Sequence, residues 1–123
     1  MSRILVADDS YFAIKNLKQI LTKAGHEIVA EVTDGEQACR EYRKHKPDLV
    51  TIDITMPVMG GLKAIRDIIR EFPDAKIVVI SASTVGQVVF EALQNGARHY
   101  IFKPFYPDEI INVIDKVLKE EHV

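Results

Sequence analysis

The fold of this chain is decided by the stretch Leu49-Val50-Thr51-Ile52-Asp53-Ile54-Thr55-Met56-Pro57-Val58-Met59-Gly60-Gly61. Its first four residues are apolar or β-branched, which predicts a buried strand that ends at the carboxylate of Asp53. The proline and the glycines that follow favour a turn. Taken alone, Asp53 either caps the strand end or takes part in chemistry, and residues elsewhere in the chain distinguish the two.

Working outward, four further short apolar runs predict strands, and they lie at residues 4–7, 28–32, 77–80 and 100–102. Apolar residues at helical spacing follow each of the five strands. Ser10 is a suitable N-cap for the first helix, Asp34 and Gln37 form a capping-box pattern for the second, and Pro107 suits the first turn of the last. Strands and helices are therefore expected to alternate along the whole chain.

The fourth helix is expected to open at the segment Ser81-Ala82-Ser83-Thr84 and to close at Asn95-Gly96. Its apolar positions are Val85, Val88, Val89, Ala92 and Leu93. The run at 28–32 carries Glu31 on one face, which favours a sheet edge, whereas the run at 77–80 is apolar on both faces and favours a central strand.

Regular alternation without a linker, repeat or low-complexity segment predicts an α/β fold in a single domain over residues 1–123. The small size suits a doubly wound, flavodoxin-like parallel sheet of five strands in the order 2-1-3-4-5, with five helices on its two faces. In such a sheet a ligand binds beyond the carboxyl ends of the strands, near the point between strands one and three where the order reverses.

Composition excludes several classes of protein. With 16 basic against 18 acidic residues, the net charge of −2 gives no general attraction to nucleic acid or to a membrane surface. No apolar run approaches a membrane span, and Met1-Ser2-Arg3 leads directly into the first strand without a signal peptide. The single cysteine, Cys39, is expected to be a small buried hydrophobe. We expect a cytoplasmic, monomeric protein.

Polar side chains stand at the predicted strand ends: Asp8 and Asp9, then Asp53, Ser81 and Lys103. Three neighbouring carboxylates need positive charge, and an all-oxygen acidic site suits Mg²⁺. Lys103 adds a fixed cation, and Ser81 adds a hydroxyl. Because phosphoryl transfer depends mostly on positioning and charge neutralisation, this set predicts a phosphoryl-transfer site with Asp53 as the nucleophile.

Competing chemistries find little support. The four histidines, at 26, 45, 99 and 122, show no metal-ligand spacing. A haloacid-dehalogenase-like phosphohydrolase typically carries a second acid two residues after its nucleophile, where this chain has Thr55. A flavin-binding module would need a Ser/Thr-rich phosphate loop after the first strand, where this chain has Asp8-Asp9.

The chain closely resembles the receiver domains of two-component response regulators, and among them the single-domain CheY-like proteins. The motifs that carry the resemblance are Asp8-Asp9, Asp53 followed by Met56-Pro57 and Gly61, Ser81-Ala82, and Tyr100 three residues before Lys103-Pro104-Phe105. Together they span essentially the whole length. Position 81 holds serine where the family more often has threonine.

The resemblance implies that Asp53 accepts a phosphoryl group from a sensor histidine kinase or a phosphotransfer protein. Asp9, Asp53 and the main-chain carbonyl of Thr55 would bind Mg²⁺, and Asp8 would do so directly or through water. The phosphoryl oxygens would be held by Lys103, the Ser81 hydroxyl and the Ala82 amide, and a cis bond before Pro104 would aim Lys103 into the site. The protein would catalyse its own phosphorylation and dephosphorylation without otherwise being an enzyme.

The resemblance also implies a switch, in which the Ser81 hydroxyl moves toward the phosphoryl group and Tyr100 turns inward. Without the family, Tyr100 would be expected to keep its hydroxyl in water. A downstream protein would bind the face made by the fourth helix, fifth strand and fifth helix, including Val89 and Phe105. A free-standing chemotaxis or phosphorelay protein is expected, since Met1 lies just before the first strand and the chain stops after the fifth helix; the alternative is a receiver domain cut from a DNA-binding transcriptional regulator.

Overall fold

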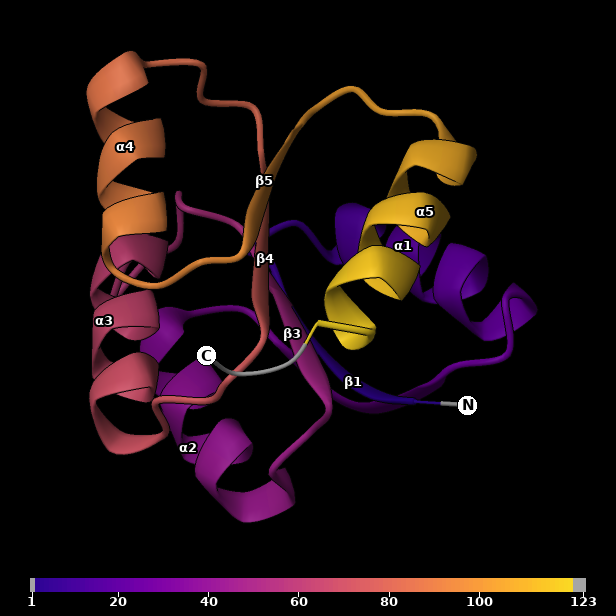
Figure 1. Ribbon diagram of the computed structural model, residues 1–123, viewed down its shortest axis with the longest axis horizontal. Coiled ribbons are helices and arrows are strands. Elements are labelled where there is room, and N and C mark those ends of the chain that lie inside the picture. Colours follow the sequence, from indigo (N-terminus) through magenta and orange to yellow (C-terminus); the bar gives the residue numbers. More distant parts are fainter. Residues whose placement is uncertain (1, 121–123) are drawn as a thin grey trace.

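The computed structural model describes residues 2–120, in which five strands alternate with five helices (Figure 1). The strands are β1 (Arg3–Ala7), β2 (Glu27–Val32), β3 (Leu49–Ile52), β4 (Ile77–Ser81) and β5 (His99–Phe102). The helices are α1 (Tyr11–Lys23), α2 (Gly35–His45), α3 (Gly61–Glu71), α4 (Gly86–Gln94) and α5 (Pro107–Leu118).

All strand pairs are parallel, and the order β2-β1-β3-β4-β5 confirms the predicted α/β fold class. The register aligns Ala7 with Val32 on one side and with Ile52 on the other, and Ile52 with Val79. The carboxyl ends of β1 and β3 therefore lie level, and β4 runs two residues further, so the residues that follow these strands meet at one edge of the sheet.

Helices cover both faces of the sheet, with α1 and α5 on one side and α2, α3 and α4 on the other (Figure 1). Alternate residues of each central strand supply the two cores, because successive strand side chains point to opposite faces. Ile4 and Val6 pack in the core beneath α1 and α5, whereas Leu5 and Ala7 pack in the core beneath α2 and α3. The central strands are buried on both faces, and β2 lies at the sheet edge as its charged face predicted.

Two of the predicted helix starts are confirmed by their hydrogen bonds. The Ser10 hydroxyl accepts a bond from the Ala13 amide at 3.2 Å, and the Asp34 carboxylate accepts one from the Gln37 amide at 2.8 Å. The Gln37 side chain reaches back to the Thr33 amide at 3.2 Å, one residue before the position of a complete capping box.

The expected start of the fourth helix is wrong. Helix α4 begins at Gly86, and the Ser81 main chain remains in the strand, where its carbonyl accepts a bond from the Lys103 amide at 2.9 Å. Strand pairing with β5 thus prevails over the local preference of serine for a helix start. Only Ala92 of the predicted apolar stripe of α4 is fully buried. Val85 and Leu93 are 59% and 45% exposed, and Val88 and Val89 are half-buried, so the stripe is only partly covered.

Candidate functional site

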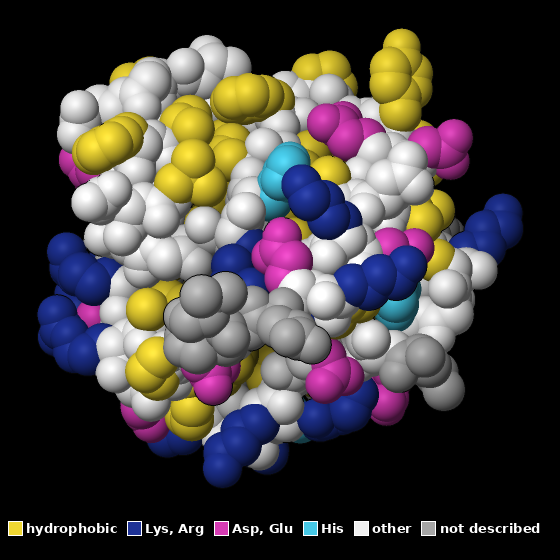
Figure 2. Space-filling model, viewed as in Figure 1, with side chains coloured by type: hydrophobic (Ala, Val, Ile, Leu, Met, Phe, Trp, Pro, Cys, Tyr) yellow, Lys and Arg dark blue, Asp and Glu magenta, His cyan; other side chains and the backbone are white. Residues whose placement is uncertain are grey.

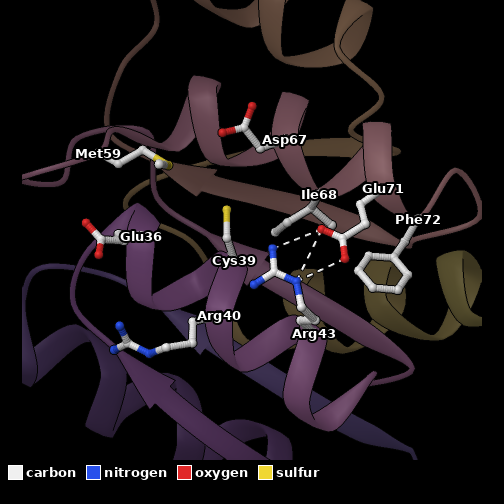
Figure 3. A pocket seen from close by; sticks show the side chains of 9 residues that line it. All are labelled: Glu36, Cys39, Arg40, Arg43, Met59, Asp67, Ile68, Glu71 and Phe72. Atoms are coloured by element: carbon white, nitrogen blue, oxygen red, sulfur yellow. Dashed lines mark hydrogen bonds and ion pairs between the residues drawn. The ribbon is translucent and has the colours of Figure 1, made fainter.

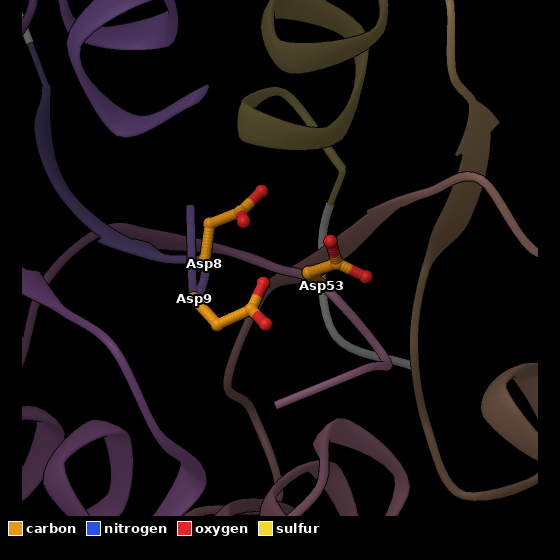
Figure 4. A group of neighbouring side chains, drawn as sticks. All are labelled: Asp8, Asp9 and Asp53. Atoms are coloured by element: carbon orange, nitrogen blue, oxygen red, sulfur yellow. The ribbon is translucent and has the colours of Figure 1, made fainter. Parts of the chain in front are cut away.

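Three carboxylates meet at the carboxyl ends of β1 and β3. Asp8, Asp9 and Asp53 each place an oxygen within 4.8 Å of the others, and Figure 4 shows the three side chains converging. Asp8 and Asp53 are 6% and 7% exposed, whereas Asp9 is exposed. The level strand ends produce this cluster, because Ala7 and Ile52, the residues that precede Asp8 and Asp53, are register partners.

Lys103 reaches this cluster from the loop after β5. Its Nζ lies 2.6 Å from Asp8 Oδ2 and 3.0 Å from Asp53 Oδ2. The peptide bond between Lys103 and Pro104 is cis, as the resemblance implies. Lys103 therefore neutralises part of the negative charge of two acids that lie 45 residues apart in sequence and are both largely removed from water.

Burial and charge shift the pKa values of this group. Burial raises the pKa of the Asp8 carboxyl above its usual range, although the hydrogen bond from Lys103 opposes the shift. Burial lowers the pKa of the Lys103 ammonium, but its hydrogen bonds to Asp8 and Asp53 outweigh burial, and the net effect is a raised pKa. Lys103 is thus held in its charged form at neutral pH.

The remaining oxygens of the two buried acids accept bonds from the main chain. Asp8 Oδ1 accepts from the Ser10 amide at 2.9 Å, and Asp53 Oδ1 accepts from the Thr55 amide at 3.1 Å. Each carboxylate is therefore oriented by an ammonium on one oxygen and an amide on the other. This arrangement fixes the direction in which each acid presents its lone pairs.

The donor set of the cluster fits a magnesium ion. Three carboxylates against one ammonium leave two excess negative charges, which one divalent cation balances. Mg²⁺ takes oxygen ligands and commonly uses one or two carboxylates together with water and phosphate oxygens. Asp9, exposed at the rim, leaves the cluster open to an ion and a phosphoryl group from solution.

The loop that follows Asp53 is anchored at three points. Met56 is buried in the core, and the Gly61 amide donates a bond to the Ile54 carbonyl at 2.8 Å. A Cβ at Gly61 would overlap the Asp53 carbonyl oxygen and lie 2.7 Å from the Ile54 Cα, so only glycine allows α3 to begin so close to the strand end. The third anchor is a bond at 2.7 Å from the Gly35 amide to the Met59 carbonyl.

The predicted switch residues lie on adjacent strands. Ser81 is 1% exposed, and its Oγ accepts a bond from the Ser83 amide at 3.2 Å. The Tyr100 hydroxyl donates to the Ser83 carbonyl at 2.9 Å, and Tyr100 is only 9% exposed, so the expectation from residues alone of a hydroxyl in water is wrong. Ala82 lies between these groups in the exposed loop before α4.

Exposed apolar side chains gather over α4, as Figure 2 shows. Phe90 is 59% exposed and Phe102, on β5, is 44% exposed, with the Phe102 ring 5.2 Å from that of Tyr100. We did not identify Phe90 or Phe102 as surface residues from the sequence. Helical spacing does predict that Phe90 is exposed, since it places Phe90 off the apolar face that contains Val88, Val89 and Ala92.

A separate groove lies between α2 and α3, away from the acidic cluster (Figure 3). Its cavity volume is about 340 Å³, and Cys39, Met59 and Phe72 contribute to its lining. Arg43 and Glu71 pair across it, with their closest N–O distance at 2.9 Å. Cys39 was expected to be a small buried hydrophobe; it packs against the core but is only half-buried.

Histidine does not enter the acidic cluster within residues 2–120. His26 accepts a bond from the Ser2 amide at 3.3 Å, and His45 lies 3.4 Å from Glu41 in the same helix. His122 lies outside the described residues. Across that same described part of the chain, every helix is too short or too polar to cross a membrane.

Comparisons with known proteins agree with this geometry. Residues 4–115 match the family model of the response regulator receiver domain. A chemotaxis protein CheY of Thermotoga maritima is 45% identical, over 95% of this chain and 98% of its own. A chemotaxis protein CheY of Bacillus subtilis is 44% identical, over 94% of this chain and 97% of its own.

Solved structures give the same result. A chain of the CheX-CheY-BeF3-Mg+2 complex from Borrelia burgdorferi superposes with a TM-score of 0.92 at 35% identity, covering 96% of this chain and 90% of that one. The response regulator domain of Thermotoga maritima CheB superposes with a TM-score of 0.90 at 29% identity, covering 98% of both chains.

Proposed function

The chain belongs to the response regulator receiver domain family and is closely related to chemotaxis CheY proteins. We propose that it is a phosphorylation-activated signalling switch that accepts a phosphoryl group on Asp53. We further propose that residues 1–123 form one such receiver domain, which acts in the cytoplasm as a CheY-like protein of a two-component system. It is a signalling protein and not a classical enzyme. The observation that carries the proposal is the buried carboxylate of Asp53, oriented by Lys103 and the Thr55 amide beside two further acids.

In the proposed transfer, an Asp53 oxygen attacks the phosphorus of a phosphohistidine on a sensor kinase or phosphotransfer protein. The phosphorus–nitrogen bond breaks, its electron pair returns to the histidine ring, and an acyl phosphate forms on Asp53. Water then breaks the bond between the phosphoryl group and Asp53, which restores the carboxylate, releases inorganic phosphate and ends the signal. The protein would catalyse both steps on itself. The nucleophile would be a carboxylate oxygen of Asp53, which Lys103 and the Thr55 amide orient.

Magnesium would be held by Asp9, Asp53 and the main-chain carbonyl of Thr55, with Asp8 binding directly or through water. When bound, Mg²⁺ supplies positive charge that offsets the repulsion between the phosphoryl oxygens and the carboxylates. The fit of three carboxylates supports this assignment, as does the presence of Mg²⁺ in the Borrelia burgdorferi complex.

Three groups would hold the phosphoryl oxygens once they arrive: the Lys103 ammonium, the Ser81 hydroxyl and the Ala82 amide. Lys103 already lies 3.0 Å from Asp53, so it can exchange a carboxylate oxygen for a phosphoryl oxygen with little movement. Ser81 would leave the Ser83 amide when its hydroxyl turns toward the phosphoryl group.

This turn couples the site to the surface through the loop after β4. Tyr100 holds that loop through the Ser83 carbonyl, so a change at Ser81 alters the support of both Tyr100 and α4. We propose that the face of α4, β5 and α5, which includes Val89, Tyr100 and Phe105, binds the downstream protein. The exposed side chains of Phe90 and Phe102 support this assignment, because clustered exposed apolar residues mark interaction sites.

Incubation with Mg²⁺ and acetyl phosphate tests the proposed function directly. Intact-protein mass spectrometry is expected to show one added phosphoryl group on the wild type and none on Asp53→Asn or in the presence of a chelator. Asp34→Asn is the matched control, since Asp34 is also buried but caps α2 outside the acidic cluster, and it should label as the wild type does. Equal labelling of Asp53→Asn and the wild type would refute the assignment.

A further inference from the structure

The first residue of α2 touches the loop that follows the phosphorylation site. Gly35 donates its amide hydrogen to the Met59 carbonyl at 2.7 Å. A Cβ at Gly35 would overlap the Met59 carbonyl oxygen and would lie 2.9 Å from the Met59 carbonyl carbon and 3.0 Å from the Gly60 oxygen. These are main-chain atoms, which cannot rotate away as a flexible side chain could.

The backbone of Gly35 does not itself require glycine. The glycines with positive φ among the described residues are Gly25 and Gly96, so Gly35 has a conformation open to any residue. A side chain at this position has no space, because main-chain atoms of the loop after Asp53 occupy it. The close approach between α2 and the loop therefore depends on the absence of a Cβ at residue 35.

The same junction between β2 and α2 also supports the acidic side of the site. The Val32 carbonyl, at the end of β2, accepts a bond from the Asp8 amide at 3.0 Å. Three residues later, Gly35 holds Met59. One short segment is thus bonded to the strand end that bears Asp8 and to the loop that bears Thr55.

The loop between these contacts has little freedom to absorb a displacement. It is fixed at Asp53 through the Thr55 amide, at Met56 by burial in the core, and at Gly61 by close contact with the Asp53 carbonyl. Val58, at its crown, is already in the left-handed region with φ of 64°. A shift forced at Met59 would therefore be passed back along the loop toward Thr55.

We propose that Gly35 is a positioning residue of the phosphorylation site: by admitting the Met59 carbonyl against the start of α2, it sets where Thr55 lies relative to Asp8 and Asp53, and thereby the affinity for Mg²⁺. The inference rests on the proposed function, in which Thr55 supplies a carbonyl to the ion. Mg²⁺ demands near-ideal octahedral geometry, so a displaced carbonyl is poorly tolerated.

Isothermal titration calorimetry with Mg²⁺ alone tests this proposal on the wild type and three variants. Gly35→Ala is expected to raise the Kd for Mg²⁺ by about tenfold or more, the range found when groups that orient metal ligands are removed. Gly86→Ala makes the same chemical change at the first residue of α4, where a Cβ meets nothing within 4 Å, and should leave the Kd unchanged.

A third variant separates positioning from loss of stability. Asp34→Ala removes the cap of α2 and so destabilises the same helix end without pushing on the loop. Its unfolding midpoint in urea should fall while its Kd for Mg²⁺ stays within about twofold of the wild-type value, well short of a positioning effect. If Asp34→Ala weakens Mg²⁺ binding as much as Gly35→Ala does, or if Gly35→Ala binds as the wild type does, the positioning role is refuted.

A measurement on the wild type applies even if Gly35→Ala fails to fold. Because coupled interactions stabilise each other reciprocally, saturating Mg²⁺ should slow hydrogen exchange of the Gly35 amide, while that of the Gly86 amide stays the same. Unchanged exchange at Gly35 would overturn the proposal. Failure of the wild type to bind Mg²⁺ would instead refute the proposed function, and the positioning role with it.

Discussion

The hydroxyl of Tyr100 donates a hydrogen bond to the main-chain carbonyl of Ser83 at 2.9 Å, joining β5 to the loop after β4. The Ser83 amide in turn donates to the Ser81 hydroxyl, so one residue connects the two groups of the proposed switch. Neither bond involves Asp53, and both can therefore change without breaking the acidic cluster.

Tyr100→Phe is expected to lower the free energy of unfolding by about 0.5–1.5 kcal/mol, because it removes one hydrogen bond and leaves the carbonyl of half-buried Ser83 without that partner. Urea denaturation measures this, and hydrogen exchange should quicken in residues 82–85. Phosphorylation by acetyl phosphate should keep its rate, since Tyr100 makes no contact with Asp53. Tyr11→Phe, at a side chain 75% exposed, is the control and should change neither quantity.

Lys103→Met is expected to destabilise the Mg²⁺-free protein by about 1–3 kcal/mol at pH 7, less than for a fully buried ion pair because Lys103 is partly exposed. Its removal leaves Asp8 and Asp53 without the cation that they share. Mg²⁺ should restore more stability to this variant than to the wild type, because it replaces the missing charge.

Chemical denaturation with and without Mg²⁺ gives the stability lost in Lys103→Met and the stability that Mg²⁺ restores. Lys63→Met provides the matched control, since Lys63 pairs with Asp67 at 2.8 Å on an exposed surface. This substitution should change the free energy of unfolding by less than about 0.5 kcal/mol. An equal effect of the two substitutions would show that the charge of Lys103 contributes nothing to the folded state beyond that of a surface ion pair.

Thr51→Val is expected to raise the free energy of unfolding by about 1 kcal/mol or more. The Thr51 hydroxyl in β3 is the one fully buried side-chain polar atom in residues 2–120 that lacks a hydrogen-bond partner, so a methyl group of similar size removes a desolvation cost. Thr51→Ser, which keeps the hydroxyl and deletes the methyl, should instead lower stability. A loss of stability in Thr51→Val would mean that the hydroxyl has a partner.

The thiol of Cys39 is expected to react slowly with iodoacetamide in the native protein. Burial raises the pKa of Cys39, so at pH 8 the folded chain holds less of the reactive thiolate than an unfolded chain does. The native rate should rise with pH, and its inflection should lie at a higher pH than that of an unfolded cysteine. Rates measured from pH 7 to 10 in buffer and in urea test this, and a native inflection at lower pH than the unfolded one would contradict it.

Much of the fold follows from local patterns in the sequence. The strands are short apolar runs, and the caps at Ser10 and Asp34 act within three residues of themselves, so neighbouring residues suffice to predict them. Alternation of strands and helices predicted a parallel sheet, and the small size suited the doubly wound arrangement with the observed strand order. Because parallel strands end at one edge of a sheet, the strand ends also predicted that Asp8, Asp9 and Asp53 would gather there.

The tertiary structure decided what depends on contacts between distant residues. Pairing of Ser81 with Phe102 delayed the start of α4, and the packing of α4 on the sheet left Phe90 and Leu93 exposed. Tyr100 is buried because a carbonyl 17 residues earlier accepts its hydroxyl, and Gly35 is needed because the loop after Asp53 lies against it.

Sequence alone thus determined which residues form the strands, where these end and which acids stand there, since periodicity and capping act over a few residues. Only the folded chain decided that Tyr100 bonds to the Ser83 carbonyl and how closely α2 approaches the loop, because these depend on packing between segments that the sequence keeps far apart.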